Sequence, residues 1–307
     1  MPIVVPPGLD NQRELGRGWG DWLDRLPRLT AELVEEWGLT LDGPVWHGFC
    51  SLVPAVRTES GIPAVLKLTF DGDDESEHEG VALQHWAGRG TVRLLRADPR
   101  RRALLLERLG REDLTTIGYV EAAEVVGGLY AALHVPALPQ LRTVTSYVDG
   151  WLDDLAALAR DAPIPRRMVE QALHLGRALV SDPESTGVIV HSDLHDHNVL
   201  ASPRGPWLVI DPKPMSGDPH YEPAPMLWNR WEEIASGDER TAVRSRFHTL
   251  VDVAGLDEER ARAWVVVRMV LNAHWAIQDA HRFGRPLDQD EHDWVTRCIA
   301  VVKAVQD

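Results

Sequence analysis

The sequence predicts an α+β protein in two parts: a strand-rich part that ends near Gly110 and a mostly helical part that follows it. Two observations support this division. Before residue 110, short aliphatic and β-branched runs alternate with turn sequences, whereas later apolar residues recur mostly at three-to-four-residue spacing. We therefore expect a small antiparallel sheet within residues 1–110 and a larger helical part over residues 111–307.

Local patterns place the elements of the first part. The segment Trp19–Trp37 has the apolar spacing of an amphipathic helix, with Pro27 as a potential break and Gly38 as its end. The remaining elements expected are two β-rich runs in residues 44–70 around the hairpin signal Glu59–Gly61, a helix over residues 75–88, and strands over residues 91–98 and 102–109 joined by a turn.

The second part is predicted to be helical, with two short strand-like interruptions. No internal repeat, low-complexity tract or flexible linker separates its segments. Helices are expected over residues 119–134, 144–161, 165–182 and 239–305, and strand-like pieces over residues 187–193 and 206–211.

Composition excludes several classes of protein. Hydrophobic residues make up 44% and charged residues 26% of the chain, as in ordinary soluble globular proteins. The two cysteines, Cys50 and Cys298, form no CxxC pair, and no apolar run approaches the roughly 18 residues of a membrane helix. The first residues lack the basic start and apolar stretch of a secretory signal. We therefore expect a cytoplasmic protein. For its oligomeric state we expect a monomer or a homodimer.

Net charge also bears on partners. The chain carries 32 basic and 47 acidic side chains, a formal net charge of −15. Such a molecule repels nucleic acid and anionic membranes, so we expect neither as a partner. An acidic balance can attract a cationic ligand, but solubility alone also explains it.

The segment Val190–Leu200, VHSDLHDHNVL, admits a metal-cage and a catalytic-loop interpretation. A binuclear hydrolase array, His-x-His-x-Asp-His, requires histidine where Asp193 stands, and no HExxH cluster occurs elsewhere. Phosphoryl transfer instead uses an Asp that accepts a hydroxyl proton, an Asn five residues later and an Asp on the next strand. Asp193, Asn198 and Asp211 meet this requirement. We predict Asp193 as the catalytic residue and Asn198 and Asp211 as Mg²⁺ ligands.

Lys67 is the predicted phosphate-binding cation. It lies in the apolar run AVLKLTF, where an ammonium group is costly unless it meets a phosphate or a carboxylate. Glu79, on the next predicted helix, can pair with it, and Glu75 and Glu77 are close alternatives. An edge-strand lysine that faces water is the competing interpretation.

The segment His47–Val53, HGFCSLV, is the expected phosphate-covering loop. It has no GxGxxG pattern and contains only Gly48. Backbone N–H groups near Ser51 would therefore have to hold the phosphates.

These segments together resemble the aminoglycoside phosphotransferase family, most closely its streptomycin 6-kinase and hydroxyurea-resistance kinase branch. The resemblance covers nearly the whole chain. Its most specific strings are IDPK at residues 210–213 and GDPxYE at residues 217–222, which are typical of that branch. Within the second string we expect His220 and Tyr221 to support the metal loop and Glu222 to tie that loop to a helix.

The resemblance implies a protein-kinase-like two-lobed fold, with a small antiparallel-sheet N-lobe and a larger helical C-lobe, and ATP and Mg²⁺ as cofactors. Lys67 and Glu79 resemble the phosphate-binding pair of the family. Backbone groups around Glu107 to Leu109 would form the adenine-binding hinge. Ser192 stands where the branch commonly has glycine.

The acceptor is expected over the helical lobe, near Asp193. The segments LWNRWEEI and NAHWAIQDA resemble those that line this pocket in the family. Glu232, Glu233 and Asp279 can hold a cation. Trp228 and Trp275 can stack on a ring or a cationic group. The alternative is that both tryptophans belong to the core and the acids are solvated.

The leading prediction is an ATP- and Mg²⁺-dependent O-phosphotransferase whose small, polar or cationic acceptor is an aminoglycoside, a streptomycin-like aminocyclitol or an amino sugar. Hydroxyurea, a sugar or an amino alcohol are alternative acceptors. A nucleotide-binding pseudokinase and a metallohydrolase are alternatives of other classes.

Overall fold

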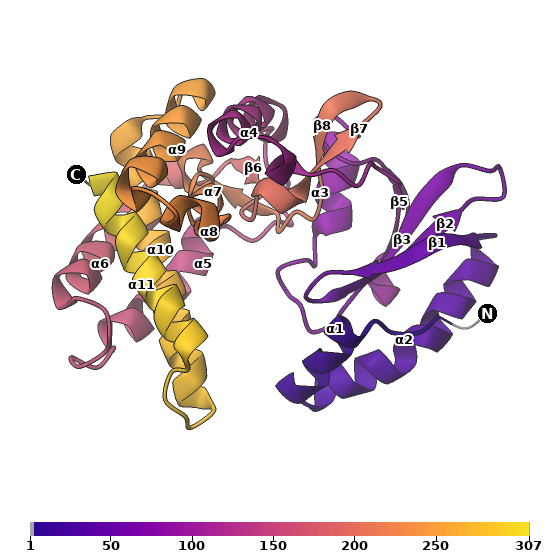
Figure 1. The fold of residues 1–307 in the computed structure, drawn as a ribbon, viewed down its shortest axis with the longest axis horizontal. Helices are drawn as coiled ribbons and strands as arrows, with labels where there is room; N and C mark the ends of the chain where they lie inside the picture. The colour runs from indigo at the N-terminus through magenta and orange to yellow at the C-terminus, as the bar shows by residue number, and fades with distance from the viewer. Residues whose placement is uncertain (1–2, 307) are drawn as a thin grey trace. The chain divides into compact units, whose positions relative to one another are not determined.

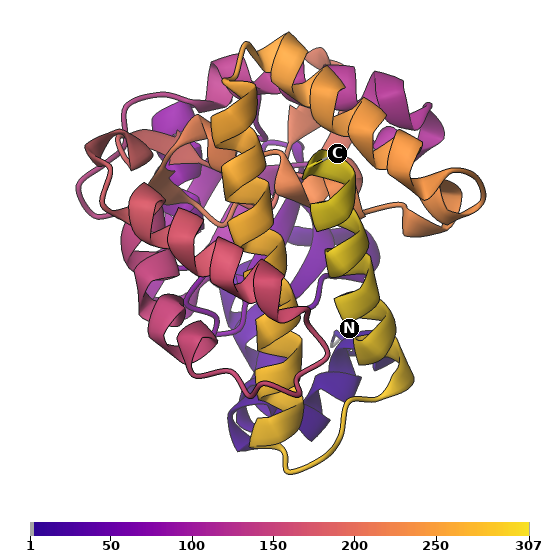
Figure 2. The same ribbon diagram turned by 90° about the vertical axis from the view of Figure 1, so that its left-hand side faces the viewer.

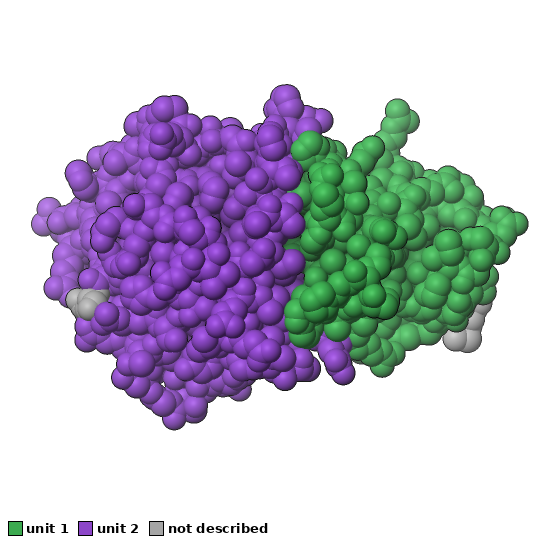
Figure 3. All heavy atoms as spheres, turned by 90° about the horizontal axis from the view of Figure 1, so that it is seen from above, with its two compact units in different colours: residues 1–111, 201–213 green, residues 112–200, 214–307 purple. Residues whose placement is uncertain are grey.

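The computed structural model describes residues 3–306, which divide into two compact units (Figure 3). Unit 1 combines residues up to 111 with residues 201–213, and unit 2 combines residues 112–200 with the chain from 214 onward. The single boundary expected near residue 110 did not include the segment 201–213 in the first part. Backbone hydrogen bonds explain its place: Val92 N–H donates to Val209 O at 2.9 Å, and Gly110 N–H to Ala201 O at 2.8 Å.

Unit 1 is built on a five-stranded antiparallel sheet in the order β1-β2-β3-β5-β4. Figure 1 labels β1, β2, β3 and β5 of this sheet. Sequence reasoning counted two β-rich runs in residues 44–70, whereas the structure has three strands between residues 40 and 69. The elements of the first 111 residues are α1 (Pro7–Asp10), η1 (Asn11–Leu15), α2 (Arg17–Glu36), β1 (Thr40–His47), β2 (Ser51–Arg57), β3 (Pro63–Thr69), α3 (Glu79–Trp86), β4 (Leu94–Asp98), η2 (Pro99–Arg101) and β5 (Ala103–Glu107).

The core of unit 1 lies between α2 and one face of the sheet (Figure 1). Leu23, Leu26 and Leu33 of α2 are fully buried, and they belong to one cluster with Leu66 and Leu68 of β3. The helix continues through Pro27, so the potential break does not occur. Because side chains alternate along a strand, Lys67 points to the opposite face from its two leucine neighbours.

Unit 2 is mostly helical, with α10 at its centre. Figure 2 shows α10 beside α6 and α11, and α4 packs against α9. Its helices are η3 (Leu114–Thr116), α4 (Tyr119–Leu133), α5 (Val144–Ala156), α6 (Arg166–Val180), η4 (Pro183–Ser185), η5 (Asp196–Asn198), η6 (Pro219–Tyr221), α7 (Ala224–Trp228), α8 (Trp231–Ala235), α9 (Glu239–Ala254), α10 (Glu258–Arg282) and α11 (Gln289–Gln306).

Two short sheets complete the fold. Within unit 2, β6 (Val188–Val190) pairs with β9 (Met215–Gly217) in antiparallel register. β7 (Val199–Ser202) and β8 (Gly205–Val209) form a second two-stranded sheet. β6 leads directly into the segment that contains Asp193, and β8 leads to Asp211.

No helix within residues 3–306 combines the length and the apolar character needed to cross a membrane.

Candidate functional site

Lys67 lies at the centre of a buried ion-pair group in unit 1. Its Nζ atom is 2.6 Å from Oε2 of Glu79 and 2.6 Å from Oδ1 of Asp211. Burial lowers the pKa of Lys67, but the two carboxylates raise it more, so the net shift is upward and the ammonium stays protonated. Glu75 and Glu77 are exposed, which identifies Glu79 as the partner in α3. The lysine is therefore not a solvated edge-strand residue.

Asp211 stands just after β8 in a left-handed backbone conformation, with φ of 55°. Such a conformation is uncommon for a residue other than glycine. Its side chain is 34% exposed, in contrast to the 7% of Lys67. A second ammonium, Nζ of Lys213, is 3.8 Å from the same Oδ1 atom. Sequence reasoning assigned no role to Lys213, although its place two residues after Asp211 in IDPK was a usable signal.

The loop that contains Asp193 is held by its own polar groups. The Asp193 N–H donates to Nδ1 of His191 at 3.3 Å, and the side-chain amide of Asn198 donates to the Asp193 carbonyl at 2.9 Å. Asn198 ends η5, whose first turn is capped by Nδ1 of His195. Asp193 and Asn198 are thus joined by a direct hydrogen bond within unit 2.

Glu222 fixes the start of this loop. It is fully buried and accepts the backbone N–H groups of His191, at 2.5 Å, and Ser192, at 3.1 Å. Burial works to raise the pKa of Glu222, but His134, 3.6 Å away, and the His191 N–H outweigh it, so the pKa lies below its usual value. Glu222 was expected to tie the metal loop to a helix; the structure shows it bound to the backbone before Asp193.

Asp218 is the buried centre of the GDPxYE string. It accepts hydrogen bonds from Nε1 of Trp264 at 2.8 Å and from Nε of Arg260 at 2.5 Å, both in α10. The backbone and ring of His220 also donate to it, at 3.0 and 2.5 Å. This string therefore anchors β9 and η6 to α10.

Arg230 performs a similar task beside η5, and sequence reasoning missed it. Its guanidinium group is 3.2 Å from Oδ1 of the buried Asp196 and donates to the carbonyls of Leu114 and Ile117 at 3.0 Å. Glu233 binds the same group at 2.7 Å. A buried Asp196 with an arginine partner supports the loop and does not belong to a metal cage.

The histidines of the loop make hydrogen bonds. His197 Nδ1 is 2.8 Å from Oδ2 of Asp113, and His195 Nε2 is 3.2 Å from the Asn198 amide nitrogen. Across residues 3–306, no group of three or more His, Cys, Asp or Glu side chains is arranged to hold a metal ion.

The predicted phosphate-covering loop is the tight β1–β2 turn. The Gly48 N–H donates to the carbonyl of Ser51 at 3.0 Å, and Ser51, 4% exposed, begins β2. Behind the turn, the Phe70 N–H donates to the Cys50 carbonyl at 2.8 Å. The cradle of backbone N–H groups near Ser51 stays a prediction.

The predicted hinge residues lie at and just after the end of β5: Glu107 is its last residue, and Leu109 follows two positions later. The carboxylate of Glu107 binds the guanidinium of Arg204 and the backbone N–H of Arg93, the latter at 2.8 Å. Its own N–H donates to the Arg93 carbonyl at 3.0 Å. The side chain of Glu107 therefore supports the sheet, and any hinge contact would come from neighbouring backbone groups.

The predicted acceptor residues lie on two helices of unit 2. Trp275 of α10 packs edge-on against Tyr147 and Trp151 of α5, with ring centroids 5.8 and 5.6 Å away. Asp279 lies one turn later on α10 and is exposed, as is Glu232 on α8. The structure thus places Trp275 and Asp279 on one helix and Glu232 on another.

Trp228 packs against neighbouring side chains of unit 2. Its ring contacts Trp294 edge-on, and the guanidinium of Arg268 lies 5.2 Å from its centroid. Arg268 also donates to the carbonyl of Ser192. Trp228 therefore supports the arginine that binds the loop containing Asp193.

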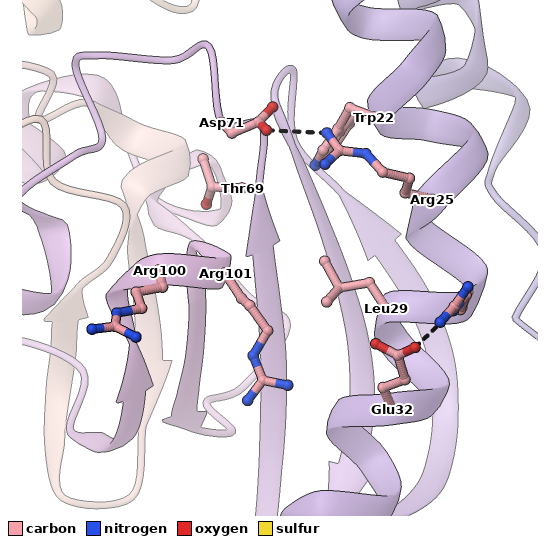
Figure 4. Close-up of a pocket in the computed structure, with 9 residues that line it drawn as sticks. Trp22, Arg25, Leu29, Glu32, Thr69, Asp71, Arg100 and Arg101 are labelled. Carbon is pink, nitrogen blue, oxygen red and sulfur yellow. Dashed lines mark hydrogen bonds and ion pairs between the residues drawn. The ribbon is translucent and has the colours of Figure 1, made fainter.

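A cavity of about 280 Å³ lies elsewhere in unit 1, between α2, the end of β3 and η2 (Figure 4). Arg25 and Arg28 on its rim are paired with Asp71 at 3.0 Å and Glu32 at 2.7 Å. None of the predicted site residues lines it. Its lining comprises Trp22, Arg25, Arg28, Leu29, Glu32, Thr69, Asp71, Arg100 and Arg101.

The residues predicted to hold Mg²⁺ have suitable chemistry. The nitrogen of the Asn198 amide donates to Asp193, so its carbonyl oxygen is the end that can serve a cation. Asp211 contributes a partly exposed carboxylate. Carboxylate and amide oxygens are ligands that Mg²⁺ accepts. The donor set therefore fits this ion.

Comparisons with known proteins agree with these features. Residues 36–280 match the family described as aminoglycoside/hydroxyurea antibiotic resistance kinase. Streptomycin 6-kinase from Streptomyces glaucescens is 40% identical over 288 residues, which cover 91% of this chain and 92% of that protein. Hydroxyurea phosphotransferase from Kitasatospora aureofaciens is 40% identical over 275 residues, which cover 86% of this chain and 77% of that protein.

A solved structure shows the same fold at low identity. It is a thermostable mutant of aminoglycoside phosphotransferase APH(4)-Ia in a ternary complex with ADP and hygromycin B. The match has a TM-score of 0.60 and 18% identity, and it covers 90% of this chain and 98% of that one. The fold class predicted from the sequence, α+β and protein-kinase-like, is confirmed.

Proposed function

Because this chain belongs to the aminoglycoside/hydroxyurea antibiotic resistance kinase family, we propose that it transfers the γ-phosphoryl group of ATP to a hydroxyl group of a cationic aminocyclitol or amino sugar. The family assignment makes the chain a small-molecule phosphotransferase. The acceptor class is the proposed part, together with a cytoplasmic location and a monomeric or homodimeric state.

One observation carries the nucleotide half of the proposal: the buried Lys67 ammonium lies 2.6 Å from both Glu79 and Asp211. A protonated lysine at a fixed position supplies the charge that a triphosphate requires, and its glutamate partner fixes that position. Leaving this lysine buried without such partners would be costly.

Asp193 is proposed to orient the acceptor hydroxyl and to accept its proton. Phosphoryl transfer depends mainly on positioning and on charge stabilisation, so the rigidity of the loop matters. Two sets of hydrogen bonds provide that rigidity. The Asn198 amide donates to the Asp193 carbonyl, and the Glu222 carboxylate accepts the two backbone N–H groups that precede Asp193.

Asn198 and Asp211 are proposed to hold Mg²⁺. When bound, this ion neutralises charge on the phosphate oxygens. The side-chain carbonyl of Asn198 and the carboxylate of Asp211 would each contribute an oxygen ligand. Lys213 beside Asp211 adds a second fixed positive charge in unit 1.

The acceptor is proposed to be cationic because of the chain's charge. With a formal net charge of −15, the protein attracts a positively charged small molecule. The exposed Asp279 and Glu232 provide carboxylates on unit 2. Streptomycin kinases appear among the relatives at up to 40% identity. A relative named for hydroxyurea is equally similar, at 40%, so hydroxyurea is the second candidate acceptor.

A coupled assay tests the proposal. Purified protein with ATP and Mg²⁺ should release ADP in the presence of streptomycin or another amino sugar, with mass spectrometry showing the phosphorylated product. Asp193→Asn should lower kcat by about 10²- to 10⁴-fold while ATP binding measured by calorimetry persists, because an amide cannot accept the proton.

The matched control is Asp252→Asn, an exposed carboxylate on α9, which should leave kcat unchanged. Retained turnover in Asp193→Asn would remove Asp193 from the catalytic role. Turnover with hydroxyurea but with no amino sugar would transfer the proposal to the second acceptor.

A further inference from the structure

The chain uses lysine sparingly. Of its 32 basic side chains only three are lysines, Lys67, Lys213 and Lys303, and the other 29 are arginines. Lys303 is exposed on α11, whereas the other two surround the carboxylate of Asp211. An ammonium is compact and an arginine fork is wide, so the two are not interchangeable at a crowded buried position. Two of the three lysines of the chain are therefore placed beside Asp211, where an arginine could not simply replace them.

The Lys213 ammonium lies close to several polar groups. Its Nζ is 2.5 Å from Oγ of Ser76, 3.5 Å from Oδ2 of Asp73, 3.8 Å from Oδ1 of Asp211 and 4.0 Å from Sγ of Cys50. Lys213 and Asp73 side chains are each only 14% exposed. We call Cys50, Asp73, Ser76 and Lys213 the Lys213 cluster.

Asp73 is the common acceptor of the cluster. Its Oδ2 atom receives the Ser76 hydroxyl at 2.5 Å and the Cys50 thiol at 3.0 Å, in addition to the approach of Lys213. Burial works to raise the pKa of Asp73, but the Lys213 charge and these hydrogen bonds outweigh it, and the pKa is lowered. Asp73 is therefore ionised, and the cluster is a charge-assisted network.

The cluster joins three segments that are distant in sequence. Cys50 belongs to the β1–β2 turn, Asp73 and Ser76 lie between β3 and α3, and Lys213 follows Asp211. The turn is bound to the second segment twice, because the Phe70 N–H also donates to the Cys50 carbonyl. Lys213 is the link between the predicted phosphate-covering turn and the predicted metal carboxylate.

The balance of charge in this region is a second indication that Lys213 is required there. Two ammonium groups, Lys67 and Lys213, face three carboxylates, Glu79, Asp73 and Asp211, in a poorly solvated region. Lys67 contacts Glu79 and Asp211, so without Lys213 the Asp73 carboxylate would lose the ammonium that lies 3.5 Å from it. Uncompensated buried charge of this kind is relieved by movement of side chains toward solvent or by protonation.

We propose that Lys213 is a positioning residue for nucleotide binding, which holds the Asp211 carboxylate and the Cys50 turn in one fixed arrangement. This inference rests on the proposed function, since it assumes that unit 1 binds Mg²⁺ and nucleotide. Groups that orient a metal ligand without touching the metal typically contribute 10- to 100-fold to metal affinity.

The test compares Lys213→Met with the wild type and with Lys303→Met, an exposed lysine on α11 as the matched control. Calorimetry measures the Kd of ADP with Mg²⁺ and with EDTA. We expect Lys213→Met to raise the Kd of Mg·ADP by roughly 10- to 100-fold and that of metal-free ADP by clearly less. Lys303→Met should match the wild type in both.

A second readout needs no nucleotide. Hydrogen exchange of the apo protein should be at least tenfold faster in Lys213→Met at the amides of Gly48 and Phe70, whose hydrogen bonds define the turn. Ser76→Ala removes only the closest Lys213 contact and should shift both readouts in the same direction by a smaller factor. If Lys213→Met does not fold, the Ser76→Ala variant still tests the proposal.

The outcomes separate the two proposals. If the wild type binds no nucleotide, the proposed function fails. If the wild type binds Mg·ADP and Lys213→Met binds it within twofold, only the role of Lys213 is overturned. Weakened binding with unchanged exchange at Gly48 and Phe70 would also overturn it, since Lys213 would then act without positioning the turn.

Discussion

The carboxylate of Glu222 accepts the backbone N–H of Ser192 at 3.1 Å while Ser192 holds a left-handed conformation, with φ of 62°. The guanidinium of Arg268 donates to the carbonyl of the same serine. Both peptide groups beside Ser192 are therefore fixed by buried side chains. The backbone enters Asp193 at a set angle because Glu222 and Arg268 hold a conformation that serine itself does not favour.

Glycine at position 192 removes this conflict. Ser192→Gly is expected to keep or raise the free energy of unfolding, by up to about 1 kcal/mol, because glycine adopts positive φ without a Cβ penalty. Ser192→Val should lower the free energy by about 1–3 kcal/mol, since a β-branched residue is strained there. Urea unfolding of both variants checks this. Equal stability of the two variants would show that the backbone at residue 192 carries no strain.

The two predicted Mg²⁺ ligands differ in charge, so substituting them should weaken ATP binding to different degrees. Asp211→Asn should weaken Mg²⁺-dependent ATP binding more than Asn198→Ala, because it removes a formal negative charge and not a neutral ligand. It also removes one of the two carboxylates at Lys67. Calorimetry with Mg²⁺ and with EDTA separates the metal contribution. Asp74→Asn, an exposed carboxylate of unit 1, is the control, and the reverse order would count against this ligand assignment.

Acid should destabilise unit 2 through Asp218. Burial works to raise its pKa, but hydrogen bonds from His220 and Trp264 outweigh it and lower the pKa to about 2, from an ordinary 3.8. A carboxylate with a lowered folded pKa stabilises the fold above its unfolded pKa, and this contribution is lost as the pH falls through the folded pKa. Up to about 2 kcal/mol should therefore disappear between about pH 4 and pH 2.

Asp218→Asn provides the measurement. At pH 5 the variant should have a lower free energy of unfolding than the wild type. This difference in free energy should become smaller as the pH falls toward 3, because only the wild type loses an ionised group at this position. Urea titrations at each pH give the free energies of unfolding. A gap that stays constant from pH 5 to pH 3 would show that this carboxylate does not titrate as described.

Much of unit 1 could be predicted from strand alternation. Leu66 and Leu68 identify the core face of β3, and this requires Lys67 to point the other way, toward an acid on the next helix. The five-residue gap from Asp193 to Asn198 likewise predicts a catalytic loop from a local spacing, and in the structure the Asn198 amide donates a hydrogen bond to the Asp193 carbonyl. Both predictions depend on geometry that is fixed within a few residues.

The supporting contacts could not be predicted, because they join distant segments. Lys213 reaches Ser76 across 137 positions, and Arg230 reaches Leu114 across 116. Periodicity says nothing about which buried acid meets which base over such separations. The same limit explains why residues 201–213 were not expected in unit 1: their place depends on hydrogen bonds to Gly110 and Val92.

The acceptor prediction concerns Asp279 and Glu232, both exposed on unit 2. If the acceptor is a cationic amino sugar, these carboxylates offset its charge. The half-buried Trp275 lies one turn before Asp279 on the same helix. Asp279→Asn and Glu232→Gln should each raise the acceptor KM by roughly two- to fivefold, the scale of an exposed ion pair, with little change in kcat or in the KM for ATP.

Added salt provides an independent check on the same carboxylates. Raising the ionic strength toward 0.15 M screens charges over roughly 8–10 Å, so it should raise the acceptor KM of the wild type and narrow its difference from both variants. Glu239→Gln, an exposed acid at the start of α9, is the matched control and should leave the KM unchanged. If salt and both substitutions leave the acceptor KM unchanged while a neutral alcohol is phosphorylated, the acceptor is not recognised by charge, and the kinase chemistry alone is retained.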